Sequence, residues 1–176
     1  MRKLLFRTVL GLPLTERAPR PDNDALAELA KRVVVAARRR LGRSLSIRAV
    51  DAGSCNGCEL EIHALNNAFY DLERFGFRFV ASPRHADVLL VTGPVTANMR
   101  EALERTYNVT PDPKWVVAVG NCAANGGVFA GSYGVVGGVD AVLPVDLHIR
   151  GCPPRPEDLL GGLLALMEGI KTERVS

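Results

Sequence analysis

From residue 46 onward, short apolar runs alternate with stretches whose apolar positions recur every three or four residues. The runs predict strands buried on both faces, and the stretches predict amphipathic helices. We expect strands at residues 47–50, 77–81, 87–91, 115–119 and 141–145, and helices at 59–74, 97–107 and 157–167. Alternating strands and helices predict an α/β fold with an open, mainly parallel sheet covered by helices on both faces.

The first 45 residues have a different pattern. Residues 26–41 carry apolar positions at helical spacing, while residues 1–21 combine leucines and basic residues with three prolines. Residues 1–43 hold eleven Lys and Arg against four Asp and Glu, a net charge of +7, and the rest of the chain carries −4. We therefore divide the chain into a basic N-terminal arm and helix (1–45) and an α/β domain (46–176).

The basic arm suggests a docking segment for an acidic partner or an anionic membrane surface. A solvated helix face is the alternative. Nucleic acid is not expected as a partner, because no aromatic residues lie between the basic ones and no binding motif is present. Removing residues 2–14 should release the protein from its complex or membrane.

The four cysteines lie in three glycine-containing loops, each at or just beyond the end of an expected strand. Cys55 and Cys58 share the first loop, Cys122 follows Gly120-Asn121, and Cys152 follows Gly151. Because parallel strands end along one edge of a sheet, distant loops can meet there. No secretory signal is apparent, so we expect a reducing compartment and no disulfides. The pattern predicts one site with four thiolates.

Four thiolates suit an iron–sulfur cluster or a zinc ion. Structural zinc sites usually consist of two close cysteine pairs that pin a small module. Here one pair is joined by two widely separated cysteines on a fold with its own core, which favours an iron–sulfur cluster. Zinc and four unlinked thiols remain alternatives.

Other candidate residues are less specific. His63, His85 and His148 are isolated histidines that are more often surface or core groups than ligands. Glu59 and Glu61 follow the first cysteine pair, where they either stabilise a helix N-terminus or take part in a proton path or subunit contact. No Walker spacing, catalytic triad or carboxylate pair is present, so no catalytic residue is predicted.

Four segments resemble one protein family in matching order: residues 53–59, 82–93, 119–123 and 144–154. This family is the small iron–sulfur subunit shared by respiratory complex I, as its 20 kDa-type subunit, and by energy-converting, membrane-bound nickel–iron hydrogenases, including that of formate hydrogenlyase. The resemblance covers roughly residues 46–168 and does not extend over residues 1–45.

The resemblance implies a flavodoxin-like domain that binds one 4Fe–4S cluster through Cys55, Cys58, Cys122 and Cys152. The complex I branch has two adjacent cysteines in its first loop. Two residues separate them here, which looks like the hydrogenase branch. Glu59 lies where the family tends to carry an acid, so the resemblance makes proton transfer a possible role.

The implied function is electron transfer within a membrane-associated, hydrogenase-like oxidoreductase, without a complete active site on this chain. The implied partners are a large nickel–iron hydrogenase-like subunit, other iron–sulfur subunits and membrane subunits. The implied location is peripheral, on the cytoplasmic side of the inner membrane. Two alternatives stay open: the equivalent subunit of a complex I-type NADH-quinone oxidoreductase, and a zinc-stabilised interaction module.

Overall fold

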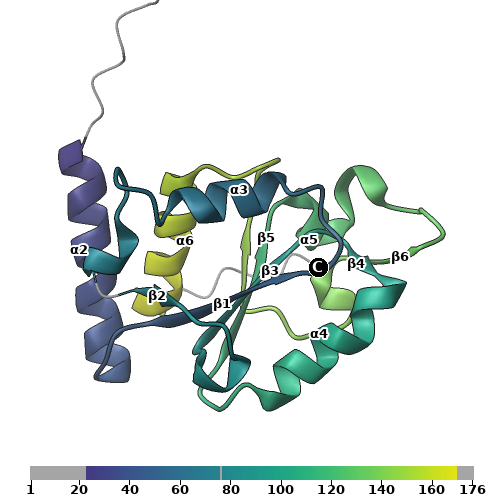
Figure 1. Ribbon diagram of the computed structural model, residues 1–176, viewed down its shortest axis with the longest axis horizontal. Helices are drawn as coiled ribbons and strands as arrows, with labels where there is room; N and C mark the ends of the chain where they lie inside the picture. Colours follow the sequence, from purple (N-terminus) through teal and green to yellow (C-terminus); the bar gives the residue numbers. More distant parts are fainter. Residues whose placement is uncertain (1–22, 76, 170–176) are drawn as a thin grey trace, which may run out of the picture.

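A computed structural model describes residues 23–75 and 77–169, which form a three-layer α/β structure (Figure 1). Its main sheet has five parallel strands in the order β2-β1-β3-β5-β7. The strands are β1 (Ser46–Asp51), β2 (Arg78–Phe79), β3 (Val88–Thr92), β5 (Trp115–Val119) and β7 (Leu147–Ile149). This order is that of flavodoxin-like folds, so the expected fold class is confirmed.

The register places the carboxyl ends of four strands at one edge of the sheet. Asp51 pairs with Thr92, and Thr92 pairs with Val119 on the other side. Val119 pairs in turn with Ile149. The loops that follow β1, β5 and β7 therefore leave the sheet side by side, and these are the loops that carry the cysteines.

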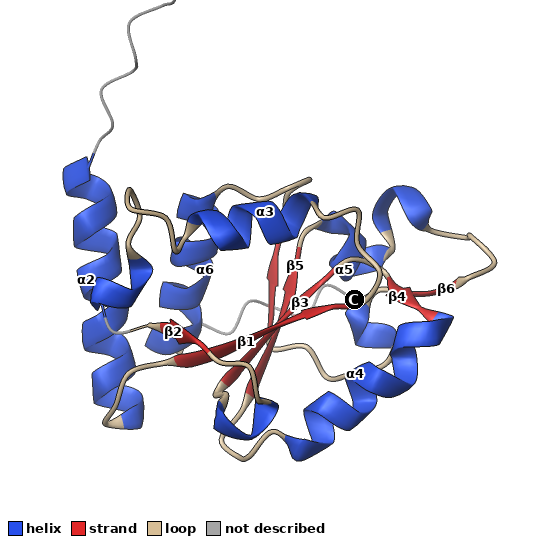
Figure 2. Cartoon of the chain, in the orientation of Figure 1, coloured by secondary structure: helices blue, strands red, loops and turns tan. Residues whose placement is uncertain are grey.

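Helices cover both faces of the sheet (Figure 2). One face packs against α2 (Asn23–Leu41), α3 (Gly57–Ala64) and α6 (Pro156–Glu168), and the other against α4 (Ala97–Val109) and α5 (Asn121–Asn125). Short 3-10 helices occupy Leu72–Phe75, Pro83–His85, Gly127–Phe129 and Val139–Ala141. Each face has its own hydrophobic core, and Cys58 packs against the core under α2, α3 and α6.

Helix α2 packs on α6 at the end of the molecule (Figure 1). Its Val33 is fully buried in the same core as Leu163. After the helix, Arg43 donates to the buried carboxylate of Asp87 at 2.9 Å, and Asp87 also accepts the N–H of Ser46 at 2.9 Å. The division at residue 45 stays a prediction, and the arm at residues 1–21 lies outside the described residues.

Two predicted elements differ from the structure. The strand expected at 141–145 is wrong: residues 139–141 form a 3-10 helix, and the strand is Leu147–Ile149. Pro144 has no N–H for a ladder, which explains the shift. The helix expected at 59–74 ends at Ala64. Asn67 Oδ1 accepts the N–H groups of Phe69 and Tyr70 at 2.8 and 3.0 Å, a turn that competes with helical bonding.

The structure also contains a small antiparallel pair that the sequence did not predict. β4 (Val95–Thr96) pairs with β6 (Val135–Gly137) beside α4 and α5. The strand expected at 77–81 is reduced to β2, Arg78–Phe79. These segments have only two or three residues each, too few to give a clear periodic pattern.

Candidate metal centre

The first cysteine loop is shaped by its own side chains. Asp51, at the end of β1, accepts the N–H groups of Gly53 and Ser54 at 2.8 and 2.7 Å. The hydroxyl of Ser54 then accepts the N–H of Asn56 at 3.0 Å, and Asn56 takes a left-handed conformation with φ 71°. Helix α3 begins at the next residue. Cys55 is consequently exposed in the loop, while Cys58 is half-buried in the first turn of the helix.

The second and third cysteine loops are hydrogen-bonded to each other. The N–H of Gly120 donates to the carbonyl of Ile149 at 2.7 Å, and that of Asn121 donates to Gly151 at 2.8 Å. In return, the N–H of Gly151 donates to Asn121 Oδ1 at 3.1 Å. These bonds continue the pairing of β5 and β7 beyond the strands. They hold Cys122, which is buried, near Cys152, which is exposed.

Glycine allows the first loop to approach the second. A Cβ atom on Gly120 would lie only 2.6 Å from the sulfur of Cys58. Gly120 also has φ +87°, a conformation that suits glycine. Similarly, a Cβ on Gly127 would lie 2.7 Å from the sulfur of Cys122. The space around these two sulfurs is therefore kept open by residues without side chains.

The electrostatics of Cys58 place all four thiols in one region. Burial raises the pKa of the Cys58 thiol to about 12, and the negative charge of Glu59 contributes next. The thiols of Cys122, Cys55 and Cys152 each raise this pKa further. The structure thus brings together all four cysteines that the sequence singled out. Deprotonating them together is unfavourable unless a cation compensates the charge.

Cys122 has a different environment. Burial raises the pKa of its thiol, whereas a hydrogen bond from the backbone N–H of Val128 lowers it. The thiols of Cys152 and Cys55 raise it again. A backbone N–H directed at sulfur is the kind of contact that tunes a bound metal centre.

The four thiols are compatible with a metal cluster. Soft sulfur donors, small neighbouring residues and loops at the sheet edge fit a multi-iron centre. Within the described ranges, no group of three or more His, Cys, Asp or Glu side chains could hold a single metal ion.

The three histidines lie apart from this arrangement. His63 is exposed on α3, and His85 is exposed at the end of a 3-10 helix. His148 lies on β7, and its Nδ1 is buried without a hydrogen-bond partner in the part of the chain that the structure describes.

Sequence reasoning missed a cavity behind the first loop. It has a volume of about 370 Å³ and is lined in part by Arg48, Glu59, His63 and Phe79. Both carboxylate oxygens of Glu59 and Nε of Arg48 are buried there without partners among the described residues. One sequence feature could have indicated this cavity. Arg48 lies in the middle of an apolar strand, where a charged side chain is seldom buried unless it is paired.

Comparisons with known proteins agree with this geometry. A model of the family "NADH ubiquinone oxidoreductase, 20 Kd subunit" matches residues 55–166. A probable membrane-bound hydrogenase subunit of Pyrococcus furiosus is 46% identical over 149 residues, covering 85% of this chain and 89% of the relative. An NADH-quinone oxidoreductase subunit of Bacteroides thetaiotaomicron is 44% identical over 165 residues, covering 87% and 83%.

Two further similarities extend this result. Formate hydrogenlyase subunit 7 of Escherichia coli is 44% identical over 169 residues, covering 96% of this chain and 63% of the relative. A solved chain of the membrane-bound sulfane sulfur reductase, an archaeal respiratory membrane complex, matches with a TM-score of 0.65 and 40% identity, covering 79% of this chain and 76% of that one. The chain therefore belongs to the family of the 20 kDa subunit of NADH ubiquinone oxidoreductase, and it is a component of an oxidoreductase.

Proposed function

We propose that the chain carries one 4Fe–4S cluster on Cys55, Cys58, Cys122 and Cys152 and transfers single electrons within a membrane-associated, hydrogenase-like complex. The observation that carries this proposal is that the thiols of Cys122, Cys55 and Cys152 all raise the pKa of the Cys58 thiol, although the four cysteines come from three separate loops. A bound cluster would supply a one-electron redox centre. The protein supplies its position and its environment.

Several residues would set that environment. The N–H of Val128 would donate to the sulfur of Cys122, and the burial of Cys122 would limit solvent on that side. The exposed thiols of Cys55 and Cys152 would lie on the opposite, open side. An electron partner would therefore dock over these two residues, because electron transfer needs close approach.

The partner that we propose is a large nickel–iron hydrogenase-like subunit, together with other iron–sulfur subunits and membrane subunits. The separation of Cys55 and Cys58 by two residues supports the hydrogenase branch. Among the described helices, none is long and apolar enough to cross a bilayer. A peripheral position on the cytoplasmic side of the inner membrane, held through other subunits, is part of the same proposal.

A complex I-type NADH-quinone oxidoreductase is the second candidate, because the NADH-quinone oxidoreductase subunit of Bacteroides thetaiotaomicron matches this chain at 44% identity. The sequence of the neighbouring large subunit separates the two. Nickel-ligating cysteine pairs in it support the hydrogenase type, and their absence supports the quinone-reducing type.

Anaerobic purification tests the metal centre. We expect a brown protein with iron and sulfide at about four each per chain, as a 4Fe–4S cluster on four cysteines requires. A colourless protein with one zinc per chain would support the zinc-stabilised interaction module instead.

The variant Cys122→Ser tests the function of the centre within the assembled complex. It should abolish electron delivery and change the low-temperature paramagnetic resonance spectrum of the reduced complex, while circular dichroism still reports an α/β fold. Full hydrogen-linked activity in this variant would contradict the proposal.

A further inference from the structure

The segment that follows α5 has an unusual composition. Residues 126–138, called the glycine loop below, hold six glycines and no charged residue, in a chain of which 23% is charged. The loop runs from the end of α5 through β6 and projects from the molecule at the end opposite α2 (Figure 1). The proposed electron transfer uses only one group of this loop, the N–H of Val128.

Apolar side chains of the glycine loop face the solvent. Val128 is 81% exposed, and Val136 is 40% exposed. Tyr133, which lies between them in the sequence, is fully exposed. Three exposed apolar side chains within one short segment indicate a surface for contact with another molecule.

Hydrogen bonds fix the backbone of the loop, although these side chains are not buried. The N–H groups of Phe129, Ala130 and Ser132 donate to carbonyls three residues earlier, at 3.0, 3.2 and 3.1 Å. The N–H of Ala97 donates to the carbonyl of Gly134 at 2.9 Å, and β6 pairs with β4. The loop therefore presents its side chains on a fixed backbone, which lowers the entropic cost of binding a partner.

The glycine loop also contacts the proposed metal centre. The N–H of Val128 donates to the sulfur of Cys122, and a Cβ atom on Gly127 would lie 2.7 Å from the same sulfur. Through β4, the loop is joined to the first cysteine loop as well, because the N–H and the hydroxyl of Thr96 donate to the carbonyl of Ala52 at 2.9 and 3.0 Å. A molecule seated on the glycine loop would thus lie beside the centre.

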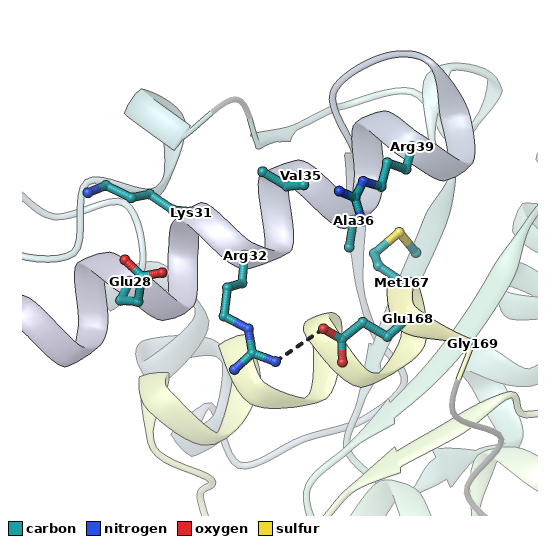
Figure 3. A pocket seen from close by; sticks show the side chains of 9 residues that line it. All are labelled: Glu28, Lys31, Arg32, Val35, Ala36, Arg39, Met167, Glu168 and Gly169. Atoms are coloured by element: carbon teal, nitrogen blue, oxygen red, sulfur yellow. Dashed lines mark hydrogen bonds and ion pairs between the residues drawn. The ribbon is translucent and has the colours of Figure 1, made fainter.

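The charge of the loop narrows the choice of occupant. The groove of about 680 Å³ between α2 and α6, by comparison, is lined by several charged side chains, among them Arg32 and Glu168, which form an ion pair (Figure 3). The glycine loop has no cation to bind lipid phosphates or nucleic acid, and no charge to pair with a charged peptide. The occupant that fits is an uncharged, partly apolar protein surface.

The number of contacts that the centre needs points to the kind of protein. Within a fixed complex, a subunit with a single one-electron centre needs two contact surfaces, because an electron enters from one neighbour and leaves to another. Under the proposed function, one partner docks over the exposed Cys55 and Cys152. A narrow projecting loop suits the second contact, since electron-transfer partners often share interfaces below about 1,200 Å², whereas obligate subunits share larger ones.

We propose that the glycine loop is the docking surface for a neighbouring iron–sulfur subunit, which seats an uncharged surface against Val128 and Tyr133. Electrons pass between the two subunits beside Cys122, and in each transfer one centre loses the electron that the other gains. The large catalytic subunit then lies over Cys55 and Cys152. This inference rests on the proposed function and adds the place at which the second partner binds.

The test uses the complex purified anaerobically through a tag on this chain. The complex is diluted in steps, and quantitative mass spectrometry counts the copies of every subunit that stay with the chain, which gives an apparent dissociation constant for each neighbour. The loop variant is Val128→Ser/Tyr133→Ser, and the matched control is Phe69→Ser/Val109→Ser. All four side chains are exposed, and each variant replaces one valine and one aromatic residue with serine.

We expect the loop variant to bind the iron–sulfur subunit at least about tenfold more weakly, as is common when an aromatic anchor is removed from an interface. It should keep the large subunit and its iron and sulfide, and the control should resemble the wild type. A second variant, Ser132→Glu, adds a charge at an exposed position of the uncharged loop and should weaken the same contact. It keeps the proposal testable if the double variant folds poorly.

Four results would overturn the proposal. The first is an unchanged affinity for the iron–sulfur subunit in both loop variants, or a wild-type complex without such a subunit. The second is equal weakening in the control. The third is loss of the large subunit instead, which would assign the loop to that partner. The fourth is a wild-type dimer of this chain that the loop variants dissociate, which would make a second copy the occupant.

The iron content separates this inference from the proposed function. A wild-type chain without iron and sulfide would refute the metal centre, whatever its neighbours do. Normal iron and sulfide in the loop variants, with every neighbour retained, would refute only the docking surface.

Discussion

At the scale of single residues, Gly120 links the fold to the proposed metal centre. It directly follows β5, donates its N–H to the carbonyl of Ile149, and lies close to the sulfur of Cys58 from the first loop. Its φ of +87° is costly for any residue with a Cβ atom. This position needs a backbone N–H, a positive φ and no Cβ atom next to the sulfur of Cys58, and only glycine meets all three requirements.

The substitution Gly120→Ala should therefore disturb the centre. Its Cβ would lie 2.6 Å from the sulfur of Cys58, so the loop or the sulfur must move. We expect a clear loss of iron and sulfide per chain after anaerobic purification, together with a loss of more than about 1 kcal/mol in the free energy of unfolding.

Gly161→Ala is the control. Among the described residues, no heavy atom lies within 4 Å of that added Cβ. This helical substitution should stabilise the protein by about 0.5–1 kcal/mol. Normal iron content in the Gly120 variant would contradict the role assigned to this residue.

The Cys58 thiol gives a pH dependence in the metal-free chain. Its pKa is raised from 9.0 to about 12, first by burial and then by Glu59. The thiol of the unfolded chain ionises near its ordinary pKa, while the folded chain keeps its proton longer. The contribution of Cys58 to stability is therefore fully present below pH 9 and is lost as the pH rises toward 12. Urea unfolding should show a steeper decline over this range in the wild type than in Cys58→Ser. Parallel curves would contradict the raised pKa.

At the scale of elements, the sequence predicts the strands that lie in the centre of the sheet. Residues 88–91 and 115–119 are uninterrupted apolar runs, and both lie in strands of the main sheet, β3 and β5. Two predicted elements were wrong for local reasons. Pro144 has no N–H for a strand at 141–145, and the turn at Asn67 competes with a helix that continues beyond Ala64. The four cysteines could be selected because each followed an expected strand. The cavity beside Arg48 and Glu59 was not predicted, although Arg48 within an apolar strand was a local signal, because the residues that line it come from segments distant in the sequence.

Helix α2 offers a test of where the folded unit begins. Val33 is fully buried against α6, so Val33→Ala should cost about 2 kcal/mol of unfolding free energy. Val35→Ala, two residues away and 48% exposed, should change it by less than about 0.5 kcal/mol. Urea unfolding of both variants measures the difference. If both variants resemble the wild type, α2 is a separate arm rather than part of the cooperative unit.

At the scale of the whole molecule, we expect the fold to be largely independent of the proposed metal centre. One core lies under α2, α3 and α6 and the other under α4 and α5, and both are built from apolar side chains. The cysteine loops lie beyond the strand ends, outside most of this packing. Structural zinc modules differ, because they unfold when the metal leaves.

Removal of the metal should consequently leave the fold in place. After treatment with a chelator and an oxidant, we expect the visible absorbance of the cluster to disappear while the far-ultraviolet circular dichroism keeps its α/β form. Thermal unfolding should remain cooperative at a lower midpoint, because ligand binding to the folded state adds stability. Collapse to an unfolded spectrum would show that the metal, and not the two cores, organises the sheet.

The hydrogen bonds between the second and third cysteine loops have a consequence for biogenesis. Because the backbones of Gly120, Asn121 and Gly151 are joined directly, Cys122 and Cys152 are set in place as soon as β5 and β7 pair. The loop of Cys55 and Cys58 is shaped mainly by its own Ser54 and Asp51. Under the proposed function, Cys122 and Cys152 would thus be positioned by the sheet before any inorganic core is bound, whereas Cys55 and Cys58 depend on a loop shaped by its own side chains.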